Sequence, residues 1–129
     1  MHVFFYRLTS GALGGKMAGL PILLLTTVGR KSGLRRTTPL MYGTEGDNLV
    51  IVASKAGMPE HPLWYTNLKA NPVVDVLVRG DARTLVARDA VGEERERLWR
   101  SMADKYSGYD EYKKKTTREI PVVVLEPQG

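Results

Sequence analysis

The chain has 129 residues, of which 43% are apolar and 26% are charged. This composition excludes a disordered segment and a chain of several domains, and we predict one domain over residues 1–129. A domain of this length can bury about two-thirds of the surface that its unfolded chain exposes, so it needs no disulfide or metal ion to fold. Cysteine is absent, which excludes disulfides, thiolate nucleophiles and thiolate metal sites and is compatible with the cytoplasmic location that we predict.

The positive charge of the chain is concentrated in one short segment. Nineteen Lys and Arg residues face fourteen Asp and Glu residues, which gives a net charge of +5. Four of the seven residues from 30 to 36 carry nearly all of this excess: Arg30, Lys31, Arg35 and Arg36. Proteins that coat nucleic acid usually spread Lys and Arg over a whole face. A local cluster instead favours one small phosphate- or carboxylate-bearing ligand, and we predict no nucleic-acid partner.

The start of the chain predicts a short helix ahead of the main body, which we place at residues 21–129. Residues 1–13 have a mildly apolar face and are followed by two glycines, so they are too short and too glycine-rich for a secretion signal. We predict that a helix over residues 1–15 packs on the body; peripheral contact with the inner face of the plasma membrane is the alternative. The apolar run from Leu20 to Val28 has nine residues, whereas a membrane span needs about twenty.

The body begins with β-like patterns. Residues 22–28 are rich in Leu and Thr, and glycines bound the turn over residues 29–33. Further strands are predicted over residues 35–42 and 49–53, and the latter is apolar enough to be buried on both faces. We expect these three strands to form an antiparallel meander. Two prolines and a glycine make residues 54–62 a connecting loop.

The second half of the body alternates helices with strands. Apolar residues recur at helical spacing between Pro62 and Asn71, and again over residues 93–106, where acidic residues crowd the first turn. A hairpin is predicted from residues 73–78 and 83–87. A short helix over residues 109–112 and a final strand over residues 120–125 follow. Hairpins linked by short helices predict an α+β, mainly β fold: a small antiparallel barrel with short flanking helices.

Most catalytic templates are absent from the sequence. His2 and His61 lie far apart without metal-binding spacing, so we expect no metal site, and neither a P-loop nor a GxSxG serine occurs. A set of binding residues remains: the cationic turn, Ser54–Lys55 at a strand end, Trp64–Tyr65, and Tyr106, Tyr109 and Tyr112 at steps of three. Arginine forks and the backbone N–H groups of a glycine-flanked turn can hold a phosphate. A solvated basic turn, and aromatic side chains that only pack the core, are the alternatives.

Several motifs in this order resemble the deazaflavin-dependent nitroreductases and quinone reductases of actinobacteria. The likeness covers nearly the whole chain after residue 20. It rests on residues 24–33 (LLTTVGRKSG), 36–40 (RTTPL), 52–57 (VASKAG), 61–72 (HPLWYTNLKANP) and 118–124 (REIPVVV). The resemblance implies a split β-barrel of the FMN-binding split-barrel type. It also implies reduced coenzyme F420 as the cofactor, whose tail carries a phosphate and several carboxylates.

By this resemblance, the cationic turn holds the cofactor tail and the neighbouring motifs contact the ring. The phosphate and tail would bind Arg30, Lys31 and Arg36, with Arg35 nearby. The ring would lie along Ser54, Lys55, Ala56 and Gly57, where a glycine permits close backbone approach. The residues that wall or orient the cofactor would be Trp64, Tyr65 and Asn67.

The resemblance also implies the reaction. The deazaflavin donates a hydride to an electrophilic acceptor such as a quinone, a nitroaromatic compound or an activated alkene, so the protein positions both partners and needs no acid–base pair. A phenol beside the acceptor can hydrogen-bond the oxygen that gains charge, and this role falls to Tyr106, Tyr109 and Tyr112. Ser54 is a second candidate for the same role.

Two other functions stay open on the sequence alone. The same fold could bind FMN in place of F420. A basic barrel could also bind single-stranded nucleic acid without catalysis. That function needs stacking aromatic residues on exposed strands, whereas Trp64, Tyr65, Trp99 and the three tyrosines fall on predicted helices. We predict a monomer or a homodimer that acts on a small-molecule acceptor.

Overall fold

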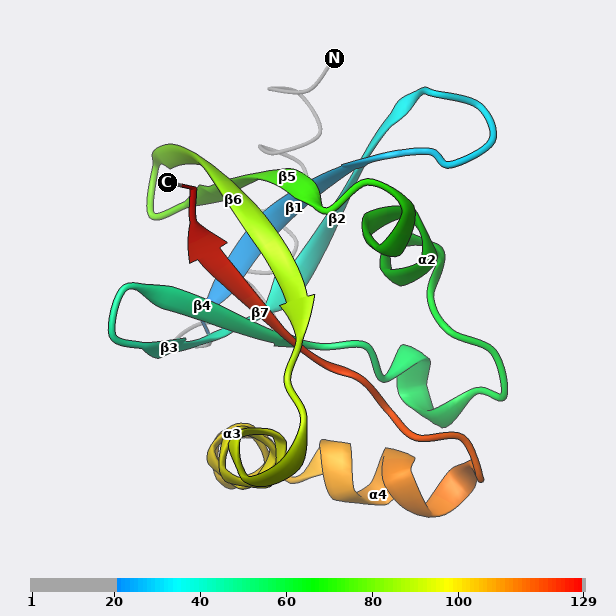
Figure 1. Ribbon diagram of the computed structural model, residues 1–129. Coiled ribbons are helices and arrows are strands. Elements are labelled where there is room, and N and C mark those ends of the chain that lie inside the picture. Colours follow the sequence, from blue (N-terminus) through cyan, green and yellow to red (C-terminus); the bar gives the residue numbers. More distant parts are fainter. Residues whose placement is uncertain (1–20, 129) are drawn as a thin grey trace, which may run out of the picture.

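The computed structural model of the chain describes residues 21–128, so the predicted helix over residues 1–15 lies outside its range. Seven strands form one antiparallel sheet in the order β2-β1-β5-β6-β7-β4-β3 (Figure 1). The strands are β1 Ile22–Val28, β2 Arg35–Met41, β3 Gly43–Glu45, β4 Asn48–Val52, β5 Val73–Val78, β6 Asp81–Asp89 and β7 Val122–Pro127. The helices are η1 Lys55–Gly57, which is a single 3-10 turn, α2 Leu63–Ala70, α3 Gly92–Lys105 and α4 Gly108–Lys115.

The sheet curls because its two edge strands follow each other in the chain. β2 forms one edge and β3 the other, yet only Tyr42 separates Met41 at the end of β2 from Gly43 at the start of β3. The two edges therefore meet at this corner, and the sheet forms a half-barrel that is open elsewhere (Figure 1). β4 pairs with β3 and β7 and not with β2, so the predicted meander is wrong. The three-residue strand β3 lies in a segment that is rich in turn-forming residues, so no strand is predicted there.

Two hydrophobic clusters lie on opposite faces of the sheet. The cluster inside the barrel joins inward-facing strand residues to Trp64, Tyr65 and Leu68 of α2. The second cluster packs Trp99 of α3 and Tyr109 of α4 against the outer face of β4 and β7. Because both faces of these two strands are covered, they are buried on both sides, which confirms the expectation for the third predicted strand.

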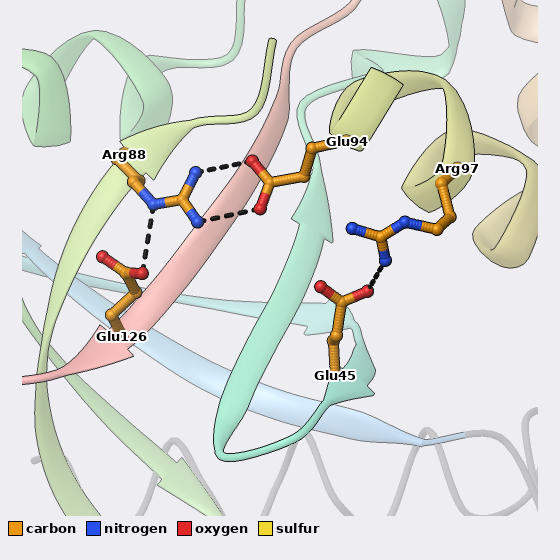
Figure 2. Close-up of polar contacts among 5 residues, drawn as sticks. All are labelled: Glu45, Arg88, Glu94, Arg97 and Glu126. Atoms are coloured by element: carbon orange, nitrogen blue, oxygen red, sulfur yellow. Dashed lines mark hydrogen bonds and ion pairs between the residues drawn. The ribbon is translucent and has the colours of Figure 1, made fainter. Parts of the chain in front are cut away.

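Ion pairs attach α3 to the sheet (Figure 2). The Arg88 guanidinium on β6 donates from Nη1 and Nη2 to the two carboxylate oxygens of Glu94 at 2.7 and 2.9 Å. Its Nε lies 3.2 Å from a carboxylate oxygen of Glu126 on β7, and Arg97 of α3 pairs with Glu45 on β3. The hydrogen bonds from Arg88 lower the pKa of Glu94. These pairs fix α3 across three strands.

The last two helices differ from expectation in their bounds. The helix predicted over residues 93–106 ends at Lys105, and Tyr106 has an extended backbone with φ −146° before α4 begins at Gly108. α4 then continues to Lys115, beyond the predicted residues 109–112. Within residues 21–128, no helix is long and apolar enough to cross a membrane.

Candidate functional site

The cationic turn is closed by backbone hydrogen bonds at the end of the first hairpin. Gly29 N–H donates to Leu34 O at 2.8 Å, and Gly33 N–H donates to Gly29 O at 2.9 Å. Gly33 has φ +74°, a conformation that side-chain-bearing residues rarely adopt. Ser32 Oγ accepts the Leu34 N–H at 3.1 Å. The turn therefore has a defined backbone.

Helix α2 holds this turn in place. Asn67 is only 6% exposed, and its Oδ1 accepts the Arg30 backbone N–H at 3.2 Å. Its Nδ2 donates to Thr27 Oγ1 at 3.4 Å, and the Arg30 Nη1 donates to Thr66 Oγ1 at 3.2 Å. Asn67, which we predict to orient the cofactor, thus ties the hairpin to α2.

A cavity of 640 Å³ lies against the turn, β2 and the start of α2. Among the described residues, its lining contains no Asp or Glu but four cationic residues: Arg30, Lys31, Arg35 and Arg36. Arg35 is held by Asp75, with 2.6 Å between Nη2 and Oδ2. Within the described part of the chain, Lys31 and Arg36 form no ion pair, so their charge is open to a ligand. The cavity is therefore suited to an anion.

A second cavity, of 400 Å³, adjoins the first. Thr38 on β2 lines both cavities. The second cavity is otherwise walled mainly by aromatic, aliphatic and hydroxyl-bearing residues, among them Ser54, Lys55, Trp64, Tyr106, Tyr109 and Tyr112. Of the predicted cofactor-binding residues, the structure thus places Ser54, Lys55 and Trp64 in this cavity and Asn67 with the four cations in the first cavity, whereas Ala56, Gly57 and Tyr65 are in neither lining.

The three tyrosines of the second cavity form one cluster. Ring centroids lie 5.3 Å apart for Tyr106 and Tyr109, 6.4 Å for Tyr106 and Tyr112, and 6.5 Å for Tyr109 and Tyr112. The hydroxyls of Tyr106 and Tyr112 are 3.2 Å apart. Burial raises the pKa of Tyr109 to about 12, and the hydrogen bond with Tyr106 raises the pKa of Tyr112. Tyr109 and Tyr112 therefore keep their protons at neutral pH and can donate hydrogen bonds.

Gly57 lets α4 approach the segment that follows β4. Gly57 has φ +77°, and a Cβ placed there would lie 2.7 Å from the backbone oxygen of Tyr112 and 3.0 Å from Lys115 Cβ. The close approach at this glycine is therefore to α4, and it places Tyr112 beside the segment. Lys55, two residues earlier, has φ +44° and its Nζ lies 3.0 Å from Glu60 Oε1. Ala56 lies between them in η1.

Tyr65 lies apart from these two cavities. It lines a third cavity of 300 Å³, together with His61, Asp89 and Arg118. The Tyr65 hydroxyl donates to the Asp89 carboxylate at 3.0 Å, and Lys69 Nζ lies 2.7 Å from the same carboxylate. Burial, followed by this hydrogen bond, raises the pKa of Tyr65 to about 12. The predicted pair Trp64–Tyr65 is therefore divided between two cavities.

The donor sets indicate the kind of group that the two adjoining cavities can hold. Unpaired cations without carboxylates suit a phosphate-bearing tail, and aromatic walls with hydroxyl groups suit a planar ring and a polar acceptor. Among the described residues, no group of three or more His, Asp or Glu could hold a metal ion. The curled antiparallel sheet and these cavities define a split-barrel protein with a site for an anionic ligand that carries a planar ring.

Comparison with known proteins identifies the family. The model of the F420H(2)-dependent quinone reductase family matches residues 1–127. An F420H(2)-dependent quinone reductase of Mycobacterium tuberculosis is 41% identical over 129 residues, which cover 97% of this chain and 87% of the relative. The chain therefore belongs to the F420H(2)-dependent quinone reductase family.

Two solved structures agree with this assignment. An F420H2-dependent reductase (FDR-A) is 47% identical, with a TM-score of 0.76 over 82% of this chain and 94% of that one. A domain-swapped dimer is 41% identical, with a TM-score of 0.76 over 97% of this chain and 96% of that one. The predicted family and split-barrel fold are confirmed, as are the oxidoreductase class and F420 as cofactor, so the FMN alternative is not needed.

Some residues that shape the site do not stand out in the sequence. Thr38 and Thr66 lie in two motifs of the resemblance but have no predicted role, and Asp89 ends β6 outside any recognisable motif. Arg118 belongs to one of the motifs that carry the family resemblance, but the sequence assigns it no role. Its hydrogen bonds join segments about sixty residues apart, which the sequence alone does not show.

Proposed function

We propose that this protein transfers a hydride from reduced coenzyme F420 to a quinone, with its own residues supplying binding and orientation. One observation carries the proposal: a cavity whose described lining has four cations and no carboxylate shares Thr38 with a cavity walled by three tyrosines. The first cavity suits the anionic tail of the cofactor, and the second suits its ring and the acceptor. Reduced F420 supplies the hydride when it is bound.

We assign tail binding to the residues of the cationic turn. Lys31 and Arg36 would pair directly with the phosphate and carboxylates, because they have no ion partner within the described residues. Arg30 would bind from a fixed position, since both its backbone and its side chain are held by α2. Arg35 would contribute less, because Asp75 already neutralises it. Ser54, Lys55 and Trp64 would contact the ring.

The tyrosine cluster would serve the acceptor. When a quinone takes up a hydride, negative charge develops on a carbonyl oxygen until a proton from solvent completes the hydroquinone, and a positioned phenol stabilises that oxygen by donating a hydrogen bond. Tyr106 and Tyr112 are suited to this role because their hydroxyls lie together, 3.2 Å apart. The Ser54 hydroxyl is the second candidate. No residue needs to act as a strong base.

The test is reduction of defined acceptors by the purified protein with F420H2. We expect oxidation of F420H2 with menadione as the quinone, and none without protein. Tyr106→Phe and Tyr112→Phe each remove one hydroxyl, and we expect each to lower kcat about tenfold with menadione. Tyr42→Phe is the matched control, because Tyr42 is buried in the barrel core and lines neither cavity. Absence of menadione reduction at saturating F420H2 would contradict the proposed reaction.

Nitroaromatic compounds and activated alkenes, the two other acceptor classes predicted from the sequence, belong in the same assay. We propose that all three classes compete for the tyrosine-walled cavity.

We also propose a homodimer that acts in the cytoplasm; a domain-swapped dimer among the similar structures supports this state. Light scattering on the purified protein should give twice the mass of the chain, and the mass of a single chain would contradict the dimer. Membrane contact through the first residues concerns a segment outside the described range.

A further inference from the structure

One side chain holds most of the loop between β4 and α2. Arg118 lies in the segment between α4 and β7, and its guanidinium points at residues about sixty positions earlier in the chain. Nη2 donates to Ser54 O at 2.7 Å, Nη1 donates to Ala53 O at 3.3 Å, and Nε donates to Met58 O at 3.0 Å. Nη1 also lies 3.1 Å from His61 Nδ1. All three guanidinium nitrogens are therefore used to hold this loop.

This loop needs an external restraint. It contains only one 3-10 turn, and Lys55 and Gly57 both have positive φ, at 44° and 77°. A left-handed backbone is strained for a residue with a side chain, such as Lys55. The backbone hydrogen bonds within the loop are few: Gly57 N–H to Ser54 O at 2.9 Å and Met58 N–H to Lys55 O at 3.0 Å. Arg118 contacts the carbonyl oxygens of Ala53 and Met58, which these bonds leave open, and adds a second donor to Ser54 O.

The chemistry of arginine fits this arrangement. Its planar guanidinium carries five N–H donors in a fixed fork and keeps its charge throughout the physiological range, so it can serve several carbonyl oxygens at once. Burial lowers the pKa of His61, and the neighbouring Arg118 charge acts in the same direction. A neutral His61 ring with its proton on Nε2 offers Nδ1 as the acceptor. The contact with Arg118 is then a hydrogen bond rather than a repulsion.

Arg118 stands outside the cavity that its loop helps to form. Ser54 and Lys55 line the tyrosine-walled cavity, whereas Arg118 lines the third cavity, beside Tyr65 and Asp89, and is not in the lining of the tyrosine-walled one. An effect of Arg118 on ligands in the tyrosine-walled cavity must therefore pass through the loop backbone.

We infer that Arg118 is a positioning residue that presets Ser54 and Lys55 for cofactor binding by fixing the carbonyl groups of Ala53, Ser54 and Met58. This inference rests on the proposed function only for the identity of the ligand. The loop restraint itself is a property of the protein without cofactor. Loss of the guanidinium would leave the cationic turn intact but would release the segment that contacts the ring.

The test compares Arg118→Ala with a matched control on another loop. Arg83 Nη2 donates to Asp47 O at 3.3 Å, so Arg83→Ala also removes an arginine–carbonyl bond, but far from this loop in the chain. We expect amide hydrogen exchange over residues 53–61 to accelerate at least about tenfold in Arg118→Ala, with the strands β5 and β6 unchanged. The Kd for oxidised F420 should rise about tenfold. Arg83→Ala should change neither quantity.

Two further measurements separate positioning from general damage. Arg118→Lys keeps the charge but offers one nitrogen in place of a fork, so we expect faster exchange over residues 53–61 than in the wild type and slower exchange than in Arg118→Ala. The salt dependence of F420 binding should stay as in the wild type, because the residues of the cationic turn are untouched. If Arg118→Ala does not fold, Arg118→Lys carries the test alone.

The outcomes distinguish this inference from the proposed function. Unchanged exchange over residues 53–61 in the folded variant overturns the role of Arg118, whether or not F420 binds. Uniformly faster exchange over the whole sheet also overturns it, because Arg118 would then be a general stabilising residue. If the wild-type protein fails to bind F420, the proposed function falls, and the exchange data still decide whether Arg118 restrains the loop.

Discussion

Gly57→Ala probes the contact that joins the ring-binding segment to the tyrosine cluster. The new methyl group would meet the backbone oxygen of Tyr112 at 2.7 Å and Lys115 Cβ at 3.0 Å, and both belong to α4. Ordinary contacts at a Cβ begin at 3.4 Å, so α4 would have to retreat by about 0.7 Å at Tyr112. Since a backbone oxygen cannot rotate away as a flexible side chain can, the displacement falls on the helix.

Two terms contribute to the expected loss of stability. An alanine at φ +77° costs about 1–2 kcal/mol for the left-handed backbone. The forced displacement of a packed helix costs about 1–3 kcal/mol more. Gly80→Ala is the matched control, because Gly80 has φ +81° in the β5–β6 turn and no atom within 4 Å of its Cβ position. Gly80→Ala therefore has the cost of the left-handed backbone but not the cost of displacing a helix.

Urea unfolding of both variants measures the difference directly. We expect Gly57→Ala to lose about 1–3 kcal/mol more free energy of unfolding than Gly80→Ala. We also expect it to raise the KM for menadione while Gly80→Ala leaves KM unchanged, because displacement of α4 moves Tyr112. Equal losses of stability in the two variants would refute the close packing of α4 on the segment.

Three further predictions test the anion site and the attachment of α3. Arg36→Ala should raise the Kd for F420 about tenfold in a titration at low salt and leave kcat at saturation nearly unchanged, while Arg100→Ala, an exposed charge on α3, should alter neither. Asn67→Ala should destabilise the fold by about 1–3 kcal/mol and weaken F420 binding, because a buried anchor of the turn is lost; equal F420 affinity would contradict its role. The folded-state pKa of Glu94 is lowered by Arg88, so this pair stabilises the fold above the unfolded pKa near 4.5 and is lost as pH falls through the folded value. Glu94→Gln should therefore cost about 1 kcal/mol or less at pH 7 and flatten the acid side of the stability curve, and a curve parallel to that of the wild type would contradict this assignment.

Local sequence signals were sufficient to predict most helices and strands but not the order in which the strands pair in the sheet. Residues 22–28 and 73–78 carry strand patterns bounded by turn residues, and the structure confirms both strands. The order of the strands depends instead on pairings between distant segments, such as β4 with β7, which no local pattern encodes. The three residues of β3 are too few to show periodicity. The predicted meander failed for this reason.

Some residues of the site could likewise be predicted from the sequence, and others could not. The cationic turn could be recognised because its charge is contiguous in the sequence, and the structure places it in a single cavity. The separation of Trp64 from Tyr65 follows from helix geometry, since consecutive residues point about 100° apart and reach different cavities. Arg118 and Asn67 act through bonds to backbone groups far away in the sequence, and such contacts leave no pattern of residue types.

Binding of oxidised F420 to the purified protein tests the central claim most directly. The titration follows the fluorescence of the cofactor at micromolar protein, with FMN titrated in parallel. The cation-lined cavity predicts a saturable change for F420 that weakens as salt is added, because the tail is held by charge. No saturable change with F420, or tighter binding of FMN, would contradict the assignment of these cavities to the deazaflavin.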